Sequence, residues 1–130
     1  PANDDAPDAV RLRLVLRGAA GAFERHPHFF GVINVLESSA DPGAAAAFAD
    51  YSDGFRASLA GALVDTAADD REVVATLVIA LLWTLLRSWA QGRMSMRAVR
   101  AQLDHSVGVI FNAPRRAAAS TSPVPTGGPS

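Results

Sequence analysis

The sequence predicts an all-α domain, an antiparallel helical bundle of about five helices whose last two form a dimerisation hairpin. Apolar residues recur every three or four positions through residues 8–112, which is the period of an α-helix. Asp41-Pro42 is a helix start signal, because Asp caps the first turn and Pro fits the first helical position. The stretch 69–92 is apolar over a length that is typical of a helix and too long for most strands.

The first element, residues 8–25, fits two patterns. Apolar residues alternate with arginines from Val10 to Arg17, as in a β-strand, but an apolar stripe at helical spacing runs from Leu12 to Phe23. We favour a helix, because the helical stripe is the longer pattern and the rest of the sequence offers no partner strand. The preceding residues, 1–7, are polar and are predicted to be a flexible lead-in.

Prolines mark the next two helices. Pro27 ends the first helix, a second helix of about residues 28–39 follows, and a third runs over about 42–66. Gly54 and Gly61 interrupt the third helix, and we expect a neighbouring helix to approach its backbone there. The apolar stripes are Phe29, Val32, Ile33 and Leu36 in the second helix, and Phe48, Tyr51, Phe55, Leu59, Ala62 and Leu63 in the third.

The fourth helix, residues 69–91, is the centre of the predicted fold. Asp69 and Glu72 fit a capping box at its start, and Gly92 suits the left-handed conformation just after its end. A helix that is apolar on two opposite sides must be covered on both. The two sides are Val74, Leu77, Val78, Leu81, Leu85 and Trp89 on one, and Ile79, Trp83, Leu86 and Ala90 on the other.

Three environments could cover such a helix. A membrane span needs about 20 apolar residues, whereas the uncharged run from Val73 to Leu86 has 14. A core that surrounds a helix completely is unusual in a chain of 130 residues. We therefore expect one side of the helix to face its own core and the other to face a second copy of the chain; the sequence does not decide which side does which.

The fifth helix begins at Ser95, which can cap it, and is expected to end near Asn112. Its apolar stripe is Met96, Val99, Leu103, Val107 and Ile110. The short turn at 92–94 makes the last two helices antiparallel, and two such hairpins can form a four-helix bundle. The remaining residues, 113–130, lack helical periodicity and are predicted to be a disordered tail.

Composition indicates a soluble globular chain without catalytic chemistry. The net charge of −1 argues against direct binding of DNA or RNA. The absence of Cys excludes disulfides, thiolate metal sites and thiol nucleophiles. His26 and His28 have no acidic or Cys partner at metal-ligand spacing, and no phosphate-binding loop follows a strand. We expect no enzyme activity, no metal and no cofactor, and, without a signal peptide or lipidation motif, a cytoplasmic location.

Three segments resemble a known family. They are RHPHFFGVINVL at 25–36, the long helix that starts at Asp41-Pro42, and LVIALLWTLLRSWAQGRMSMRAVRAQLDHSVGVIF at 77–111. In the last segment, an apolar helix ending in W-A-x-G is followed by a short turn with Ser and an amphipathic helix. Over residues 8–112 the chain resembles the C-terminal ligand-binding and dimerisation domain of tetracycline-repressor (TetR) family transcriptional regulators.

The resemblance implies an effector-sensing and dimerisation domain of a transcriptional repressor. An apolar small-molecule effector would lie between the helices, and DNA would be bound only through an N-terminal helix-turn-helix domain. That domain is absent from these 130 residues, so we expect a fragment or a truncated regulator. The helices 69–91 and 95–112 would form a homodimer, whose candidate interface residues are Ile79, Trp83, Leu86, Ala90, Val99, Leu103, Val107 and Ile110.

Aromatic side chains are the candidate lining of the effector pocket, because apolar ligands bind in clefts between bundle helices. The candidate pocket residues are Phe23, Phe29, Phe30, Ile33, Glu37, Phe48, Tyr51, Phe55, Leu77 and Leu81. Trp83 is a further ring on the central helix, and Tyr51, Asn34 and Glu37 are the polar groups that could orient a ligand. The alternative function is a helical protein–protein interaction module with no ligand pocket, whose exposed apolar face docks a partner protein.

Overall fold

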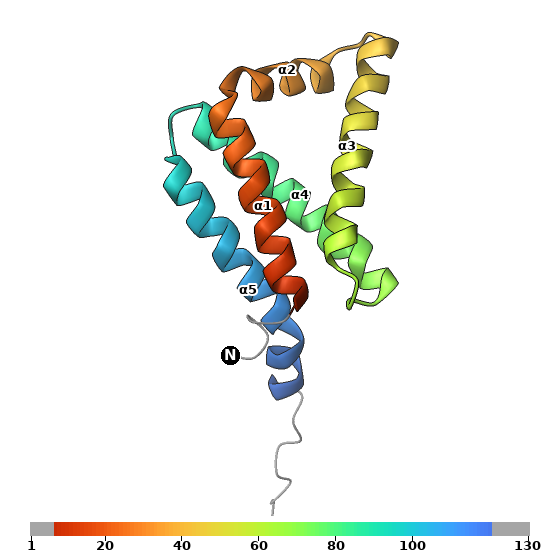
Figure 1. Ribbon diagram of the computed structural model, residues 1–130, viewed down its shortest axis with the longest axis vertical. Coiled ribbons are helices and arrows are strands. Elements are labelled where there is room, and N and C mark those ends of the chain that lie inside the picture. The colour runs from red at the N-terminus through yellow and green to blue at the C-terminus, as the bar shows by residue number, and fades with distance from the viewer. Residues whose placement is uncertain (1–6, 121–130) are drawn as a thin grey trace, which may run out of the picture.

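A computed structural model describes residues 7–120 of the chain, and the side chains of residues 7–112. This part of the chain folds into the helices α1 (Pro7–Arg25), α2 (Pro27–Ser38), α3 (Pro42–Ala62), α4 (Ala68–Ala90) and α5 (Met96–Ser120), as Figure 1 shows. No strand occurs in the described range, so the predicted all-α fold is confirmed. The first element is also a helix, as the longer of its two sequence patterns indicated.

The central helix of the bundle is α4. In Figure 1 it runs behind α1, from the end of α3 to the turn that leads into α5. The first helix, α1, packs against α5 on one side and α3 on the other, and α3 and α5 each pack against α4. The short helix α2 bridges the ends of α1 and α3, at the opposite end of these two helices from the α3–α4 turn.

Local sequence signals set several helix ends. The Asp41 carboxylate accepts a hydrogen bond from the backbone N–H of Ala44 at 3.0 Å, with Pro42 in the first turn. The backbone N–H of Ala98 donates to the Ser95 hydroxyl at 3.1 Å, at the start of α5. Gly92, in the turn after α4, has a φ of 73°, a value that L side chains rarely adopt. These three end signals were predicted correctly.

Three other helix ends differ from the prediction. The third helix, α3, ends at Ala62 instead of near residue 66. The N-cap of α4 is Ala67, which has no side-chain capping bond, and Asp69 lies inside the first turn, where its charge favours the positive end of the helix dipole. The capping box was therefore wrong. The last helix, α5, continues to Ser120 instead of ending near Asn112. Pro114 was interpreted as a break, but the Ala-rich residues after it have a high helix propensity.

The glycines of α3 do not serve close helix packing. A Cβ atom built on Gly54 or Gly61 would meet no other atom within 4 Å, and both residues are exposed. The expectation that a neighbouring helix approaches the α3 backbone at these positions is therefore wrong. Both glycines carry the usual helix-interior cost of about 1 kcal/mol relative to Ala without a packing reason.

The apolar core is continuous through the bundle. The side of α4 that faces it consists of Ala75, Val78, Ile79, Leu82, Leu85 and Leu86. This side lies between the two sides that helical spacing had proposed, because it takes Val78 and Leu85 from one and Ile79 and Leu86 from the other. The opposite side of α4 is exposed but still apolar, with Val73 and Leu77 58% and 56% exposed.

By length and composition, α4 is the one described helix that could cross a membrane. This observation is weak evidence for a membrane span, because the core helix of a soluble protein passes the same test. In this fold α4 supplies the centre of the core.

A buried carboxylate joins the start of α1 to the α3–α4 turn. Asp8 is 3% exposed and accepts hydrogen bonds from the Thr66 hydroxyl at 2.6 Å and from the backbone N–H of Asp65 at 3.2 Å. Arg11, one turn along α1, pairs with Asp8 and donates through Nε to the Ala62 carbonyl at 3.2 Å. We call these contacts the Asp8 cluster. They hold one end of α1 and the end of α3 together.

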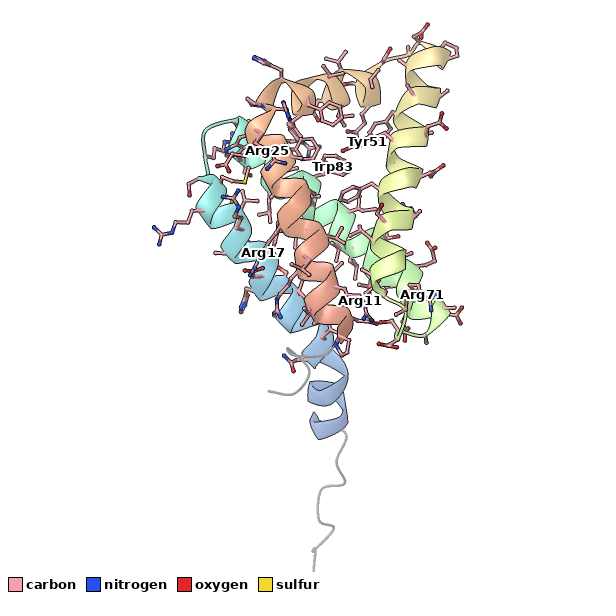
Figure 2. The ribbon with its side chains drawn as sticks, viewed as in Figure 1. Arg11, Arg17, Arg25, Tyr51, Arg71 and Trp83 are labelled. Carbon is pink, nitrogen blue, oxygen red and sulfur yellow. The ribbon has the colours of Figure 1, made fainter. Side chains whose placement is uncertain are left out.

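The same turn is also tied to α4. Arg71 donates through Nε to the Leu63 carbonyl at 3.0 Å and through Nη2 to the Thr66 carbonyl at 2.9 Å. Figure 2 shows Arg11 and Arg71 at this end of the bundle, on either side of the turn. Three helices are therefore joined here by directional contacts.

Ion pairs join α1 to α5 along their length. Arg17 pairs with Asp104 at 3.2 Å, and Arg100 pairs with Glu24 at 2.6 Å. All four side chains are more than a third exposed, so each pair contributes about 0–1 kcal/mol. Their value for the fold is mainly to fix how α1 lies along α5.

The two leucines Leu12 and Leu14 test the helical structure of α1. They would share a face in a strand, but in α1 Leu12 is fully buried and Leu14 is 61% exposed. We expect Leu12→Ala to lower the free energy of unfolding by about 2–5 kcal/mol, because it leaves a cavity. Leu14→Ala should change it by less than about 1 kcal/mol. Urea unfolding followed by circular dichroism measures both, and equal losses would contradict the helix.

The Asp8 cluster predicts a pH dependence of stability. Burial alone would raise the pKa of Asp8, but hydrogen bonds from Thr66, Asp65 and Arg11, with the charge of Arg11, outweigh burial and lower this pKa. The ionised carboxylate therefore stabilises the fold above about pH 4, and this contribution is lost as the pH falls through the lowered pKa. Asp8→Asn should be less stable than the wild type at pH 7, and the difference should shrink at low pH.

Urea unfolding at several pH values between about 7 and 2.5 measures this effect across the range in which an Asp titrates. Asp53→Asn, on the exposed side of α3, is the matched control and should leave the stability at pH 7 unchanged. A difference between the wild type and Asp8→Asn that stays constant over the whole pH range would contradict the role given to this carboxylate.

Candidate functional site

Six aromatic side chains from four helices meet beneath α2. We call them the ring cluster: Phe23 from α1, Phe29 and Phe30 from α2, Tyr51 and Phe55 from α3, and Trp83 from α4. Figure 2 shows Tyr51 and Trp83 in the space between α1 and α3, below α2. The cluster lies at the end of α1 and α3 that is remote from the Asp8 cluster.

Trp83 is the centre of the ring cluster. Its ring centroid lies 5.6 Å from that of Phe23, 5.8 Å from Phe30, 6.3 Å from Tyr51 and 6.4 Å from Phe55. Such pairs each add about 0.5–1.5 kcal/mol beyond the burial of their area. The rings are in mutual contact, so a ligand that enters the cluster must separate some of them.

Phe29 closes the cluster on its outer side. Its ring stacks on Phe23 and meets Tyr51 edge to face, with both centroid distances 5.6 Å. It is nevertheless 40% exposed, whereas its neighbour Phe30 is 2% exposed. One edge of the cluster is therefore open to solvent at Phe29.

The cluster rings offer two polar groups, the Tyr51 hydroxyl and the Trp83 indole N–H, and of these only the hydroxyl can also accept a hydrogen bond. Burial raises the pKa of Tyr51, so the hydroxyl is protonated at neutral pH. It can donate or accept one hydrogen bond beside five apolar or nearly apolar rings. This arrangement suits an aromatic ligand that carries one polar group.

The structure brings five of the ten predicted pocket residues into the ring cluster: Phe23, Phe29, Phe30, Tyr51 and Phe55. Ile33 is buried on α2, and Phe48 and Leu81 are half-buried. Glu37 is exposed at the end of α2. Leu77 faces away from the core on the exposed side of α4. The prediction that Leu77 lines a pocket between the helices is therefore wrong.

Most of the predicted interface residues lie inside their own chain. Ile79, Leu86, Val99, Leu103 and Val107 are at most 7% exposed and belong to the core. In this fold these side chains are therefore covered by their own chain and are not available to a second copy. Ile110 is half-buried against the core, Trp83 is in the ring cluster, and Ala90 is exposed. Helical spacing missed this because α4 is apolar around most of its circumference.

The exposed side of α4 forms a separate apolar surface, which we call the outer face of α4. Its residues are Val73, Leu77, Ala80 and Thr84, spaced by three or four. A shallow hollow of about 270 Å³ lies on this face. Its lining residues are Glu72, Val73, Thr76 and Leu77. Val73 and Leu77 lie next to each other in this hollow, and adjoining exposed apolar residues mark a candidate surface for contact with another molecule.

Histidine and carboxylate side chains do not assemble into a further site in the described part of the chain. His26, His28 and His105 are all exposed. Among residues 7–112 no group of three or more His, Asp or Glu side chains is placed to hold a metal ion. The chemistry that remains is the aromatic and apolar contact of the ring cluster and the outer face of α4.

Comparison with known families agrees with this arrangement. A family described as "Tetracyclin repressor-like, C-terminal domain" matches residues 6–110, which are most of the chain and all of the helices that carry the ring cluster and the outer face of α4. The curated proteins and the solved structures gave no match. The all-α fold and this match together place the chain in the tetracycline-repressor-like family, as a C-terminal domain of that family.

Proposed function

We propose that the chain is the effector-sensing and dimerisation domain of a TetR-like transcriptional repressor and that it acts without catalysis. Regulators of this family work in transcription, and their C-terminal domains typically dimerise and bind effectors. The observation that carries the proposal for this chain is the ring cluster, because it joins four helices through contacts that an inserted ligand would change. In the proposed regulator, DNA would be bound by a separate N-terminal domain, and the regulator would act in the cytoplasm.

The proposed effector is an apolar small molecule bound between the helices at the ring cluster. Five rings provide apolar contact, and the Tyr51 hydroxyl provides one hydrogen bond. A ligand shifts a conformational equilibrium only by its different affinity for the two states. In regulators, such coupling is typically about 1–3 kcal/mol. A ligand that separates α2 and α3 from Trp83 would favour one arrangement of the helices over another.

Tryptophan fluorescence tests the effector site. The chain has two Trp residues, so in Trp89→Phe the emission comes from Trp83 alone. We expect the neutral aromatic dye phenylnaphthylamine to change this emission in a saturable manner, because it would contact the Trp83 ring. In Trp83→Phe the emission comes from Trp89 on the same helix, and it should respond only at higher dye concentration, because the central ring of the site has been replaced. Equal responses of the two variants, or none in either, would contradict an effector site at the ring cluster.

The proposed dimer forms through the outer faces of α4 and α5. Val73 and Leu77 are more than half exposed although they belong to the helix that supplies the centre of the core. On α5 the exposed residues Ala101, His105 and Val109 follow one another at a spacing of four. Apart from His105 these side chains are small or apolar, which allows two helix pairs to pack into a four-helix bundle. A stable interface of this kind buries about 800 Å² on each partner.

Leu77→Glu tests the dimer. We expect the wild type to be dimeric at micromolar concentration, and the variant to be monomeric, because it places a charge in a desolvated apolar contact. The matched control is Leu14→Glu on α1, where the side chain is 61% exposed, and it should stay dimeric. Light scattering coupled to gel filtration measures the mass. A monomeric wild type would instead favour an interaction module whose outer face docks a different protein.

A further inference from the structure

Residues 27–54, which we call the upper segment, make no side-chain hydrogen bond or ion pair with α1, α4 or α5 in the described part of the chain. The upper segment comprises α2 and the first part of α3. Within the described residues, its side-chain hydrogen bonds stay inside α2, α3 and the link between them, as in the bonds of Ser38 to Asn34 and of Ala44 to Asp41. Its attachment consists of apolar contacts, chiefly those of Phe30 and the other rings.

The rest of the bundle is anchored differently. On α3, the first polar contact with another helix is that of Arg56, whose Nη1 donates to the Thr76 hydroxyl of α4 at 2.7 Å. Beyond it, the Asp8 cluster joins the end of α3 to α1, and ion pairs join α1 to α5. Hydrogen bonds and ion pairs require a fixed geometry, whereas apolar contact is non-directional. The upper segment is therefore the part of the fold whose displacement costs the least contact free energy.

Burial supports the same division. The helix α2 has two buried residues, Phe30 and Ile33, and the upper part of α3 has none, because Leu59 and Ala62 are the buried residues of that helix. By contrast, α1 and α4 each have six buried residues. Segments with few buried apolar contacts open at lower free energy than the global unfolding of a domain.

Gly54 lies at the boundary between the upper segment and the anchored part of α3. It precedes Arg56 by two residues, and packing does not require a glycine there, because a Cβ would meet nothing within 4 Å. A glycine in a helix interior weakens the helix relative to Ala and permits local bending. At the other end, the upper segment begins at Pro27, after His26, whose side chain makes no capping bond.

We propose that the upper segment is a lid over the ring cluster, hinged at Pro27 and Gly54, and that the ligand it admits is a flat aromatic molecule. This inference rests on the proposed effector-sensing function. The lid carries Phe29, Phe30 and Tyr51, whereas Phe23, Phe55 and Trp83 belong to the anchored part of the bundle. When the lid moves outward, it separates the first set of rings from the second. A flat ligand then stacks between them and replaces the ring contacts that opening breaks.

Cysteine labelling tests the lid without a ligand, since the chain has no Cys of its own. Ile33→Cys places the thiol on the inner side of the lid, where the native side chain is 3% exposed. Val35→Cys places it on the outer side of the same helix, where the native side chain is 69% exposed, and Val78→Cys places it in the core, where the native side chain is 1% exposed. We expect iodoacetamide to label Ile33→Cys more slowly than Val35→Cys but at least about 100-fold faster than Val78→Cys. Equal rates for Ile33→Cys and Val78→Cys would overturn the lid.

Two glycine variants test the hinge. Gly54→Ala and Gly61→Ala both fit α3 without a clash, but only Gly54 borders the upper segment. We expect Gly54→Ala to slow the labelling of Ile33→Cys about fivefold, because it stiffens the hinge by about 1 kcal/mol. Gly61→Ala should leave this rate unchanged. Equal slowing by both variants would show that general stability of α3, and not a hinge at Gly54, controls the opening.

Two probes test the ligand class on the Ile33→Cys variant. We expect phenylnaphthylamine, whose naphthalene group is flat and aromatic, to slow labelling because this group binds between the rings and holds the lid. Decanol, which is apolar but not aromatic, should have no such effect. Slowing by decanol alone, or equal slowing by both, would overturn the aromatic class while leaving an apolar effector site intact. If labelling is gated but the Trp83 titration shows no binding, the proposed function fails and the lid motion stands.

Discussion

The burial of one side of α4 is the constraint on which the rest of the structure depends. Leu82 and Leu86 on this side are fully buried, and each such side chain contributes about 1.5–3 kcal/mol through the removal of apolar area from water. Both α3 and α5 pack against α4, and α1 in turn packs against α3 and α5. The positions of these three helices therefore depend on the contact that buries one side of α4. It also decides which residues are left outside, since the exposed Val73 and Leu77 lie opposite the buried side.

The bundle has two ends with different kinds of contact. At one end, the carboxylate of Asp8 and the guanidinium groups of Arg11 and Arg71 hold α1, the α3–α4 turn and α4 by directional hydrogen bonds. At the other end, aromatic rings around Trp83 supply the contact. The first kind tolerates little displacement, whereas the second can exchange one ring for another of similar shape. The fold therefore combines a fixed base with an adaptable end, and the adaptable end is the candidate ligand site.

The sequence predicts local features of this fold well and long-range ones poorly. Asp41, Ser95 and Gly92 act on backbone groups a few residues away, so their roles follow from local rules. The orientation of α4 does not, because a helix that is apolar around most of its circumference has no preferred side until its neighbours are placed.

The candidate site shows the same division. The aromatic residues of the ring cluster could be named from their number and spacing, but the central position of Trp83 depends on how α1, α2 and α3 meet α4. The contact of Asp8 with Thr66 joins residues far apart in the chain and leaves no pattern in the sequence.

The position of Gly54 in α3 determines how far the α2–α3 corner moves when the helix bends there. The part of α3 from Gly54 to Pro42 is about 18 Å long at a rise of about 1.5 Å per residue. A bend of about 11° at Gly54 therefore displaces the α2–α3 corner by about 3.5 Å, which is close to the thickness of one aromatic ring. Sharp helix kinks exceed about 20°. Space for a single ring can thus be created by gentle curvature of a helix that keeps all of its backbone hydrogen bonds.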